Sequence, residues 1–170
     1  MRNHVFGDTE TTGLLLPQAA PLESQPHIVE ICFIYLGGEF HSFVKPPVSI
    51  PSEVSRIHGI TNETVMNSPS FSEIASEVCG IMQGNLVHFY NASFDSNVIR
   101  YELMRLGKIL PPCSFVDPMH DAQMDTGKRW KQADLYAALT GSKLVNAHSA
   151  LADTRALKII CETLAQRRQK

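Results

Sequence analysis

Short apolar runs bounded by turn-forming residues dominate the first half of the chain and predict β-strands. The five expected strands cover residues 2–8, 27–36, 39–45, 86–90 and 113–116. The pair Gly37-Gly38 is a hairpin signal between the second and third of these strands. Three early strands, followed by strands that alternate with helices, predict an α/β fold with a mixed sheet and helices packed on it.

Capping signals and helical spacing mark the segments between and after the later strands. Ser70 and Glu73 form a capping box at the start of one helix, and Ser93 is expected to cap the next. The expected helices cover residues 70–82, 93–106, 118–125, 131–139 and 147–167. The stretch Leu15–Pro26, rich in Pro, Ala and Gln, is instead expected to be a longer loop, which could shape substrate access or be a simple insertion.

Two carboxylates follow the first apolar run. Asp8 and Glu10 stand at positions i and i+2, so both side chains should leave one face at the end of the first strand. Adjacent carboxylates repel each other unless a cation lies between them, and hard oxygen ligands suit Mg²⁺ or Mn²⁺. Such a pair in isolation is usually two solvated acids. Here further acids follow, Asp95 after a later strand and Asp153 in a helical segment.

Three segments around these acids carry a specific signal when taken in order. They are Asp8–Leu14, Tyr90–Asp95 and Ala147–Asp153. Together they resemble the three motifs of the DEDDh 3′–5′ exonucleases, the DnaQ-like family that includes bacterial proofreading subunits. Residues 26–31 resemble the second strand of that family and residues 57–61 resemble its loop before the first helices. The resemblance implies a ribonuclease-H-like fold with a mixed five-stranded sheet, in a single exonuclease domain over residues 1–170.

The resemblance also implies a role for each acid. Asp8 would bridge two divalent metal ions, Mg²⁺ or Mn²⁺, and Glu10 with Asp153 would hold the metal on the attacking side. Asp95 would act on the second metal, largely through water. His148 would be the general base, on the loop before the last helix, because a His titrates near neutrality. The residues implied to bind the terminal nucleotide are Thr11, Thr12, Gly13, Leu14, His58 and Asn91.

The chain departs from the common motif at three positions. Gly7 stands where a bulkier residue is common, Tyr90 where His is common, and Ser149 where Arg is common. None of these changes removes a metal ligand. Tyr90 is a variant also seen in phage-type and accessory exonucleases of the family, so it weakens the assignment to a polymerase proofreading subunit.

Charge is divided unevenly along the chain, whose formal net charge is −2. Residues 1–98 hold 3 Lys or Arg and 10 Asp or Glu, whereas residues 99–170 hold 12 and 7. The small net charge argues against a general nucleic-acid coat protein. Two basic clusters, Lys128–Lys131 and Arg167–Lys170, could track a phosphate backbone, with Trp130 stacking a base. A solvated loop and a frayed helix end are the open alternatives.

The remaining signals concern location. No apolar run reaches membrane-spanning length, and Met1–His4 leads directly into the first strand without a signal peptide. The four cysteines are expected to be buried thiols of a reducing compartment; they are Cys32, Cys79, Cys113 and Cys161. A cytoplasmic location follows from this.

Five histidines show no metal-ligand spacing and are expected to be structural or on the surface. They are His4, His27, His41, His88 and His120.

Three functions are compatible with these signals. The first is metal-dependent hydrolysis at the 3′ end of single-stranded DNA, which releases nucleoside 5′-monophosphates in repair or proofreading, alone or with a polymerase or repair partner. The second is 3′ trimming of RNA, since the distinction depends on contacts to the 2′-OH. The third is a catalytically silent nucleic-acid-binding module on the same fold. The presence of all four acids and His148 disfavours the third.

Overall fold

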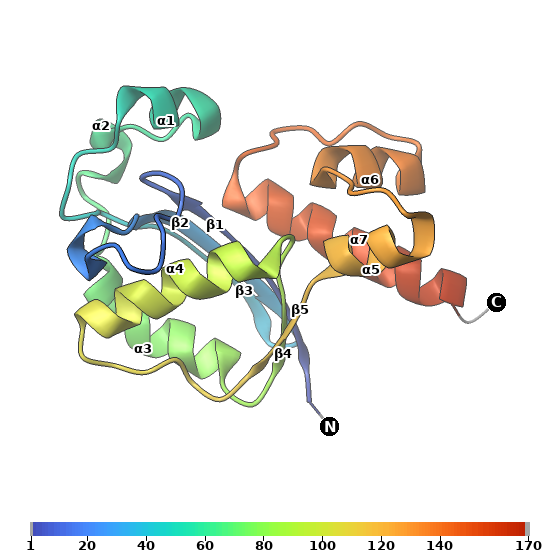
Figure 1. The fold of residues 1–170 in the computed structure, drawn as a ribbon, viewed down its shortest axis with the longest axis horizontal. Helices are drawn as coiled ribbons and strands as arrows, with labels where there is room; N and C mark the ends of the chain where they lie inside the picture. Colours follow the sequence, from blue (N-terminus) through green and yellow to red (C-terminus); the bar gives the residue numbers. More distant parts are fainter. Residues whose placement is uncertain (1, 169–170) are drawn as a thin grey trace.

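A single mixed sheet organises the computed structural model, which describes residues 2–168, with the backbone alone at residue 168 (Figure 1). Its strands are β1 (His4–Thr11), β2 (Ile28–Tyr35), β3 (Gly38–Phe43), β4 (Leu86–His88) and β5 (Ser114–Val116). The spatial order is β3-β2-β1-β4-β5. β1 pairs antiparallel with β2 and parallel with β4, and the β2–β3 pair is antiparallel. The mixed five-stranded sheet expected from the sequence is confirmed.

Helices follow and separate the strands. They are α1 (Ser52–His58), α2 (Asn62–Val65), α3 (Phe71–Met82), α4 (Ala92–Arg105), α5 (Pro118–Thr126), α6 (Gln132–Thr140) and α7 (Ala150–Arg168), with a short 3₁₀ helix η1 (Leu22–Ser24). The capping box of Ser70 and Glu73 at α3 is confirmed. The expected cap of α4 by Ser93 is wrong, because Asn91 is the N-cap in a left-handed conformation (φ 65°). The carboxylate of Asp117 accepts the backbone N–H groups of Asn91 and Ala92 and holds that turn.

Two helical layers cover the sheet (Figure 1). α3 and α4 contribute Val78, Val98 and Leu103 to a large apolar cluster that also contains Val5 and Phe33 of the sheet. α7 packs across β1 and β2 on the other side and also contacts α6. A smaller cluster of Ala122, Leu135 and Ile160 joins α5, α6 and α7. The first strand and the last helix are therefore in direct contact, although they lie at opposite ends of the sequence.

The first strand runs further than expected. It continues to Thr11, so Asp8 and Glu10 lie inside β1 and not at its end. Asp8 is opposite Cys32 of β2, and Glu10 is opposite Glu30, with a register shift between Glu10 and Thr11. The long second strand extends β1 because it supplies backbone partners as far as Ile28, which the local sequence of β1 does not reveal.

The packing around Gly7 explains why this position lacks the bulkier residue of the common motif. A Cβ at this position would lie 2.6 Å from the ring of Phe33 and 2.7 Å from the ring of Phe89. The two aromatic rings therefore occupy the space that a larger residue before Asp8 would need. Phe33 on β2 and Phe89 after β4 fill this part of the core.

The loop between β1 and β2 is held at both of its ends. The Gln25 side chain accepts from the backbone N–H of Leu16 at 3.1 Å and donates to its carbonyl at 3.3 Å. The Arg105 guanidinium of α4 donates to the carbonyl oxygens of Leu22 and Gln25, at 2.9 and 2.6 Å. It also pairs with Glu102 at 3.1 Å. The expected loop is thus fixed against α4 next to the end of β1.

The other chain-wide expectations have mixed outcomes. All four cysteines are free thiols, but only Cys32 is buried; the other three are half-buried. Of the basic tail, Gln169 and Lys170 lie outside the described residues. No helix within residues 2–168 is long and apolar enough to cross a membrane.

Candidate active site

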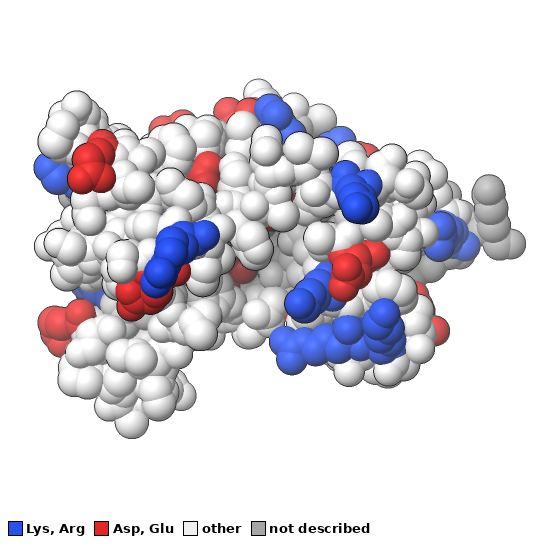
Figure 2. Space-filling view, turned by 90° about the horizontal axis from the view of Figure 1, so that it is seen from above, with Lys and Arg blue, Asp and Glu red and all other residues white. Residues whose placement is uncertain are grey.

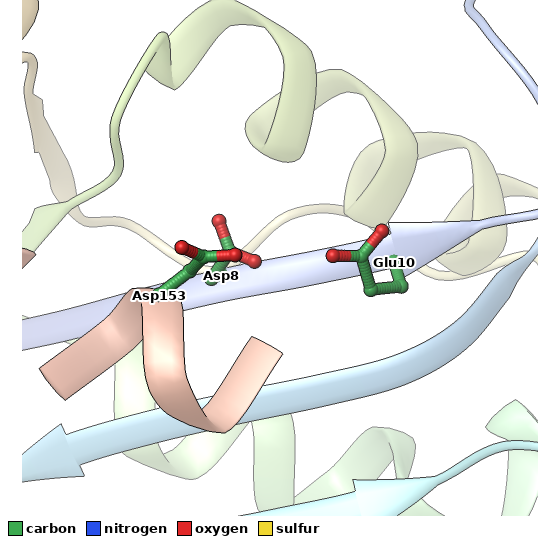
Figure 3. A group of neighbouring side chains, drawn as sticks. All are labelled: Asp8, Glu10 and Asp153. Carbon is green, nitrogen blue, oxygen red and sulfur yellow. The ribbon is translucent and has the colours of Figure 1, made fainter. Parts of the chain in front are cut away.

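Three carboxylates converge where β1 meets the first turn of α7. Asp8 and Glu10 leave the same face of β1, and Asp153 reaches them from α7 (Figure 3). One oxygen from each side chain can be chosen so that all three lie within 4.8 Å of one another. Asp8 and Glu10 therefore share one face of β1, as their i and i+2 spacing predicted. The packing of α7 on β1 adds the third acid.

Asp95 stands in the first turn of α4 and is only 3% exposed. Its Oδ1 accepts hydrogen bonds from the backbone N–H of Thr9 at 3.0 Å and from the Thr9 hydroxyl at 2.7 Å. Thr9 stands between Asp8 and Glu10 on β1, and it thereby fixes α4 to the same strand. Asp95 is not among the three acids with the closest oxygens.

Burial raises the pKa of each of the four acids. Burial, with Asp95 and Asp153 nearby, raises the pKa of Asp8 well above its usual range. Burial and the charge of Asp153 raise the pKa of Glu10 to about 8. Burial likewise raises the pKa of Asp95 to about 7, although hydrogen bonds from Thr9 oppose the shift. Burial also raises the pKa of Asp153. The cluster thus favours bound protons or bound cations.

His148 is exposed on the loop that leads into α7. Its backbone is left-handed (φ 68°), and its backbone N–H donates to Oδ2 of Asp153 at 2.7 Å. The helix begins at Ala150 and not at residue 147 as expected. The loop position that the family resemblance implied for His148 is therefore the one observed.

Glu30 is a member of the site that sequence reasoning did not single out. Its carboxylate, only 2% exposed, lies on β2 directly opposite Glu10. Oε2 accepts the backbone N–H of Ala150 at 3.0 Å, and Oε1 lies 2.7 Å from Nε2 of His41. Glu30 thereby ties the start of α7 to the sheet. The sequence signal that could have identified Glu30 is its position as an acid within the apolar run of the second strand.

The residues after Glu10 form one wall of the site. Nδ1 of His58 accepts the backbone N–H of Ile60, so its Nε2–H donates to the carbonyl of Thr11 at 3.3 Å. Burial lowers the pKa of His58. A pocket of about 350 Å³ lies beside this wall, and Thr12, Gly13 and Leu14 contribute to its lining. The side chain of Leu14 is 81% exposed and presents an apolar surface to solvent.

A sequence model of the exonuclease family matches residues 5–161. The chain belongs to this family, the DEDDh or DnaQ-like 3′–5′ exonucleases. It is 32% identical over 155 residues to DNA polymerase III subunit epsilon of Buchnera aphidicola subsp. Schizaphis graminum, which covers 85% of this chain and 64% of that subunit. It is 32% identical over 181 residues to the uncharacterized exonuclease CP81 of Escherichia phage 186, covering 96% and 89% of the two chains.

Solved structures support the same fold. Exonuclease I of E. coli, in complex with a dA16 oligonucleotide, superposes with a TM-score of 0.79 at 19% identity, covering 99% of this chain and 42% of that chain. The predicted ribonuclease-H-like architecture and the predicted enzyme class, a hydrolase of the 3′–5′ exonuclease family, are confirmed. The chain spans 64% of the Buchnera polymerase subunit, less than two thirds of its length.

The residues expected for a DEDDh exonuclease fall into two groups in space. Asp8, Glu10 and Asp153 come together, with Asp95 and His148 joined to them by hydrogen bonds through Thr9 and Asp153. Of the residues expected at the terminal nucleotide, Thr11, Thr12, Gly13 and Leu14 lie along the end of β1 and the following loop. His58 joins them from the last residue of α1 through its hydrogen bond to the carbonyl of Thr11. Asn91 stands apart as the N-cap of α4, and its side chain is half-buried.

Trp130 does not offer the free stacking surface that the sequence suggested. Its indole is half-buried against the cluster of α5, α6 and α7, and its Nε1–H donates to the hydroxyl of Thr126 at 3.0 Å. The ammonium of Lys128 lies 3.9 Å from the ring centre. The ring is therefore a structural anchor for its loop.

Proposed function

We propose that residues 1–170 form one metal-dependent exonuclease domain that removes nucleotides from the 3′ end of single-stranded DNA and releases nucleoside 5′-monophosphates. The observation that carries the proposal is the convergence of the Asp8, Glu10 and Asp153 oxygens within 4.8 Å of one another. A cytoplasmic setting, in keeping with four free thiols, belongs to the same proposal.

The donor set fits hard divalent cations. All three converging groups are carboxylates, and no Lys or Arg side chain within residues 2–167 forms an ion pair with them. Burial, together with the charges of neighbouring acids, raises their pKa values, so the ionised acids favour a bound cation. Asp8, Glu10 and Asp153 would hold Mg²⁺ or Mn²⁺, with Asp95 beside a second ion. Two such ions, when bound, make water nucleophilic at neutral pH and stabilise the charge on the leaving oxygen.

The other residues position the reacting groups. The imidazole of His148 accepts the proton of the attacking water, and its exposure leaves it free to approach a bound strand. Asp95 is prevented from turning away by its two hydrogen bonds from Thr9. Glu30 fixes the start of α7, which carries Asp153.

The wall formed by Thr11, Thr12, Gly13, Leu14 and His58 would receive the terminal nucleotide. Backbone groups of this segment would meet the sugar hydroxyl, and the exposed Leu14 would pack against the base. Asn91 would also contact the terminal nucleotide, beside Asp95.

Two of the proteins similar to this chain support DNA as the substrate, since one is a DNA polymerase subunit and another was solved with a DNA oligonucleotide. A polymerase or repair complex is the corresponding proposed partner.

Incubation of the protein with matched 5′-labelled DNA and RNA strands tests the proposal directly. With Mg²⁺ or Mn²⁺ we expect a ladder that shortens from the 3′ end of the DNA, and with EDTA no products. Faster shortening of the RNA would replace the substrate assignment with 3′ trimming of RNA. Asp8→Ala and Asp153→Ala should each abolish the ladder while far-UV circular dichroism stays unchanged. Asp134→Ala, an exposed acid on α6, is the matched control and should keep full activity.

A further inference from the structure

A basic segment connects α5 to α6. Lys128, Arg129 and Lys131 lie within four residues, and all three side chains are exposed. None of them forms an ion pair with a carboxylate in the described part of the chain. Figure 2 shows Lys and Arg side chains gathered on the half of the molecule that α5, α6 and α7 form. Three unpaired cations so close together repel one another, and an anionic partner would relieve that repulsion.

The segment is fastened to the catalytic elements at two points. The hydroxyl of Tyr90, next to the N-cap of α4, donates to the carbonyl of Trp130 at 2.7 Å. Nε2 of Gln132 donates to the carbonyl of Asp153 at 2.6 Å. One anchor therefore leads to the helix that carries Asp95, and the other contacts the backbone of Asp153 itself. The backbone that carries the three cations is therefore tied to the elements that hold Asp95 and Asp153.

The side chains of the segment favour phosphates over bases as the ligand. Lys128 lies over the ring of Trp130, which also packs against the apolar cluster of α5, α6 and α7 and donates from Nε1–H to Thr126. This arrangement orders the ammonium and removes the ring as a stacking surface for a base. Exposed Lys and Arg side chains bind backbone phosphates without reading sequence.

We propose that Lys128, Arg129 and Lys131 form a binding site for backbone phosphates of the nucleic-acid strand on the 5′ side of the bond to be cleaved. This inference rests on the proposed exonuclease function. A four-residue segment spans at most about 14 Å, which is enough for several consecutive phosphates. The site would hold a long strand while its 3′ end is at the carboxylates, and a dinucleotide would be too short to reach it.

Substrates of two lengths test the site. We compare hydrolysis of a dinucleotide with that of an oligonucleotide of about 20 nucleotides, longer than the site size of most single-strand binders. The triple variant Lys128→Gln, Arg129→Gln, Lys131→Gln should raise KM for the long strand roughly tenfold and leave kcat unchanged. Its dinucleotide kinetics should equal those of the parent protein. Lys108→Gln, an exposed lysine beyond α4, is the matched control and should behave as the parent.

Binding measured by fluorescence anisotropy in EDTA separates this site from the catalytic proposal. The triple variant should bind the long strand more weakly, and its slope of log affinity against log salt should fall by about 0.7 for each phosphate that the protein no longer neutralises. The charge-preserving variant Lys128→Arg, Arg129→Lys, Lys131→Arg should retain binding. Equal affinity of parent and triple variant would overturn the inference, as would an equal loss of dinucleotide hydrolysis. A parent protein that binds but hydrolyses neither substrate would contradict the exonuclease proposal alone.

Discussion

The backbone N–H of His148 donates a hydrogen bond to Oδ2 of Asp153, with 2.7 Å between the two atoms. The proposed base and the proposed metal ligand are thus joined through the main chain and not through the imidazole. The left-handed backbone at His148 makes this possible, because it turns the N–H back toward the first turn of α7. The imidazole remains exposed and free for chemistry.

Replacement of His148 by Ala should therefore separate catalysis from structure. We expect kcat to fall by about 10²–10⁴-fold, the usual contribution of a general base. The main-chain hydrogen bond to Asp153 remains, so the free energy of unfolding should change by no more than about 0.5 kcal/mol. Steady-state kinetics and thermal unfolding measure the two effects. His120→Ala, at another exposed His, is the control, and a His148→Ala protein with parental kcat would exclude His148 as the base.

The pKa of Glu10 predicts how stability without metal depends on pH. Burial, with Asp153 and Glu30 nearby, raises this pKa from 4.5 to about 8. The folded protein then binds a proton at Glu10 more tightly than the unfolded chain does. The stability contributed by this group is full below pH 4.5 and is lost as the pH rises through about 8.

Thermal unfolding in EDTA should accordingly show a Tm that falls between about pH 5 and about pH 8. Added Mg²⁺ should raise the Tm more at the higher pH, because cation binding requires ionised carboxylates. Glu10→Gln should flatten the fall in Tm and reduce the effect of Mg²⁺. Glu53→Gln, an exposed acid on α1, is the control. A Tm that does not differ between the two pH values in EDTA would count against the electrostatic account of the cluster.

Local signals in the sequence predicted local structure well. The capping box at Ser70 and the shared face of Asp8 and Glu10 depend only on neighbours in the chain, and both are observed. The errors lie where distant partners decide. β1 extends to Thr11 because β2 pairs with it, and Asn91 caps α4 because Asp117, 26 residues later, holds its N–H.

The candidate site shows the same division. The motifs identified the acids and His148, because these residues recur at recognisable spacings within short segments. Glu30 was missed as a site residue because its partner Ala150 is 120 residues away, and no spacing rule connects the two. Likewise, the aromatic rings that make Gly7 necessary come from β2 and from the residue after β4. Contacts between distant segments needed the structure.

Gly7 should not tolerate a side chain. Gly7→Ala places a Cβ 2.6 Å from the Phe33 ring, and this overpacking should cost about 1–3 kcal/mol of unfolding free energy. Urea denaturation measures it. Combining Gly7→Ala with Phe33→Leu should cost less than the sum of the single changes, since the two positions share one space. Gly80→Ala in α3, where a Cβ meets nothing within 4 Å, is the matched control and should stabilise slightly. A neutral Gly7→Ala would contradict the packing account.

Glu30 should act as a positioning residue for the start of α7. Glu30→Ala leaves the buried N–H of Ala150 without its acceptor, which should cost about 1–3 kcal/mol. The released loop carries His148, so kcat with saturating metal and DNA should also fall. Glu30→Gln keeps an oxygen for Ala150 and should restore most of the stability and of kcat.

Glu39→Ala is the matched control for Glu30, because it removes an acid at the sheet edge that forms an ion pair with exposed Arg155. This change should cost less than about 1 kcal/mol and leave kcat unaltered. Denaturation and steady-state kinetics on the three variants distinguish the possible results. A Glu30→Ala enzyme that is destabilised but keeps the parental kcat would show that Glu30 supports the fold without positioning the catalytic loop.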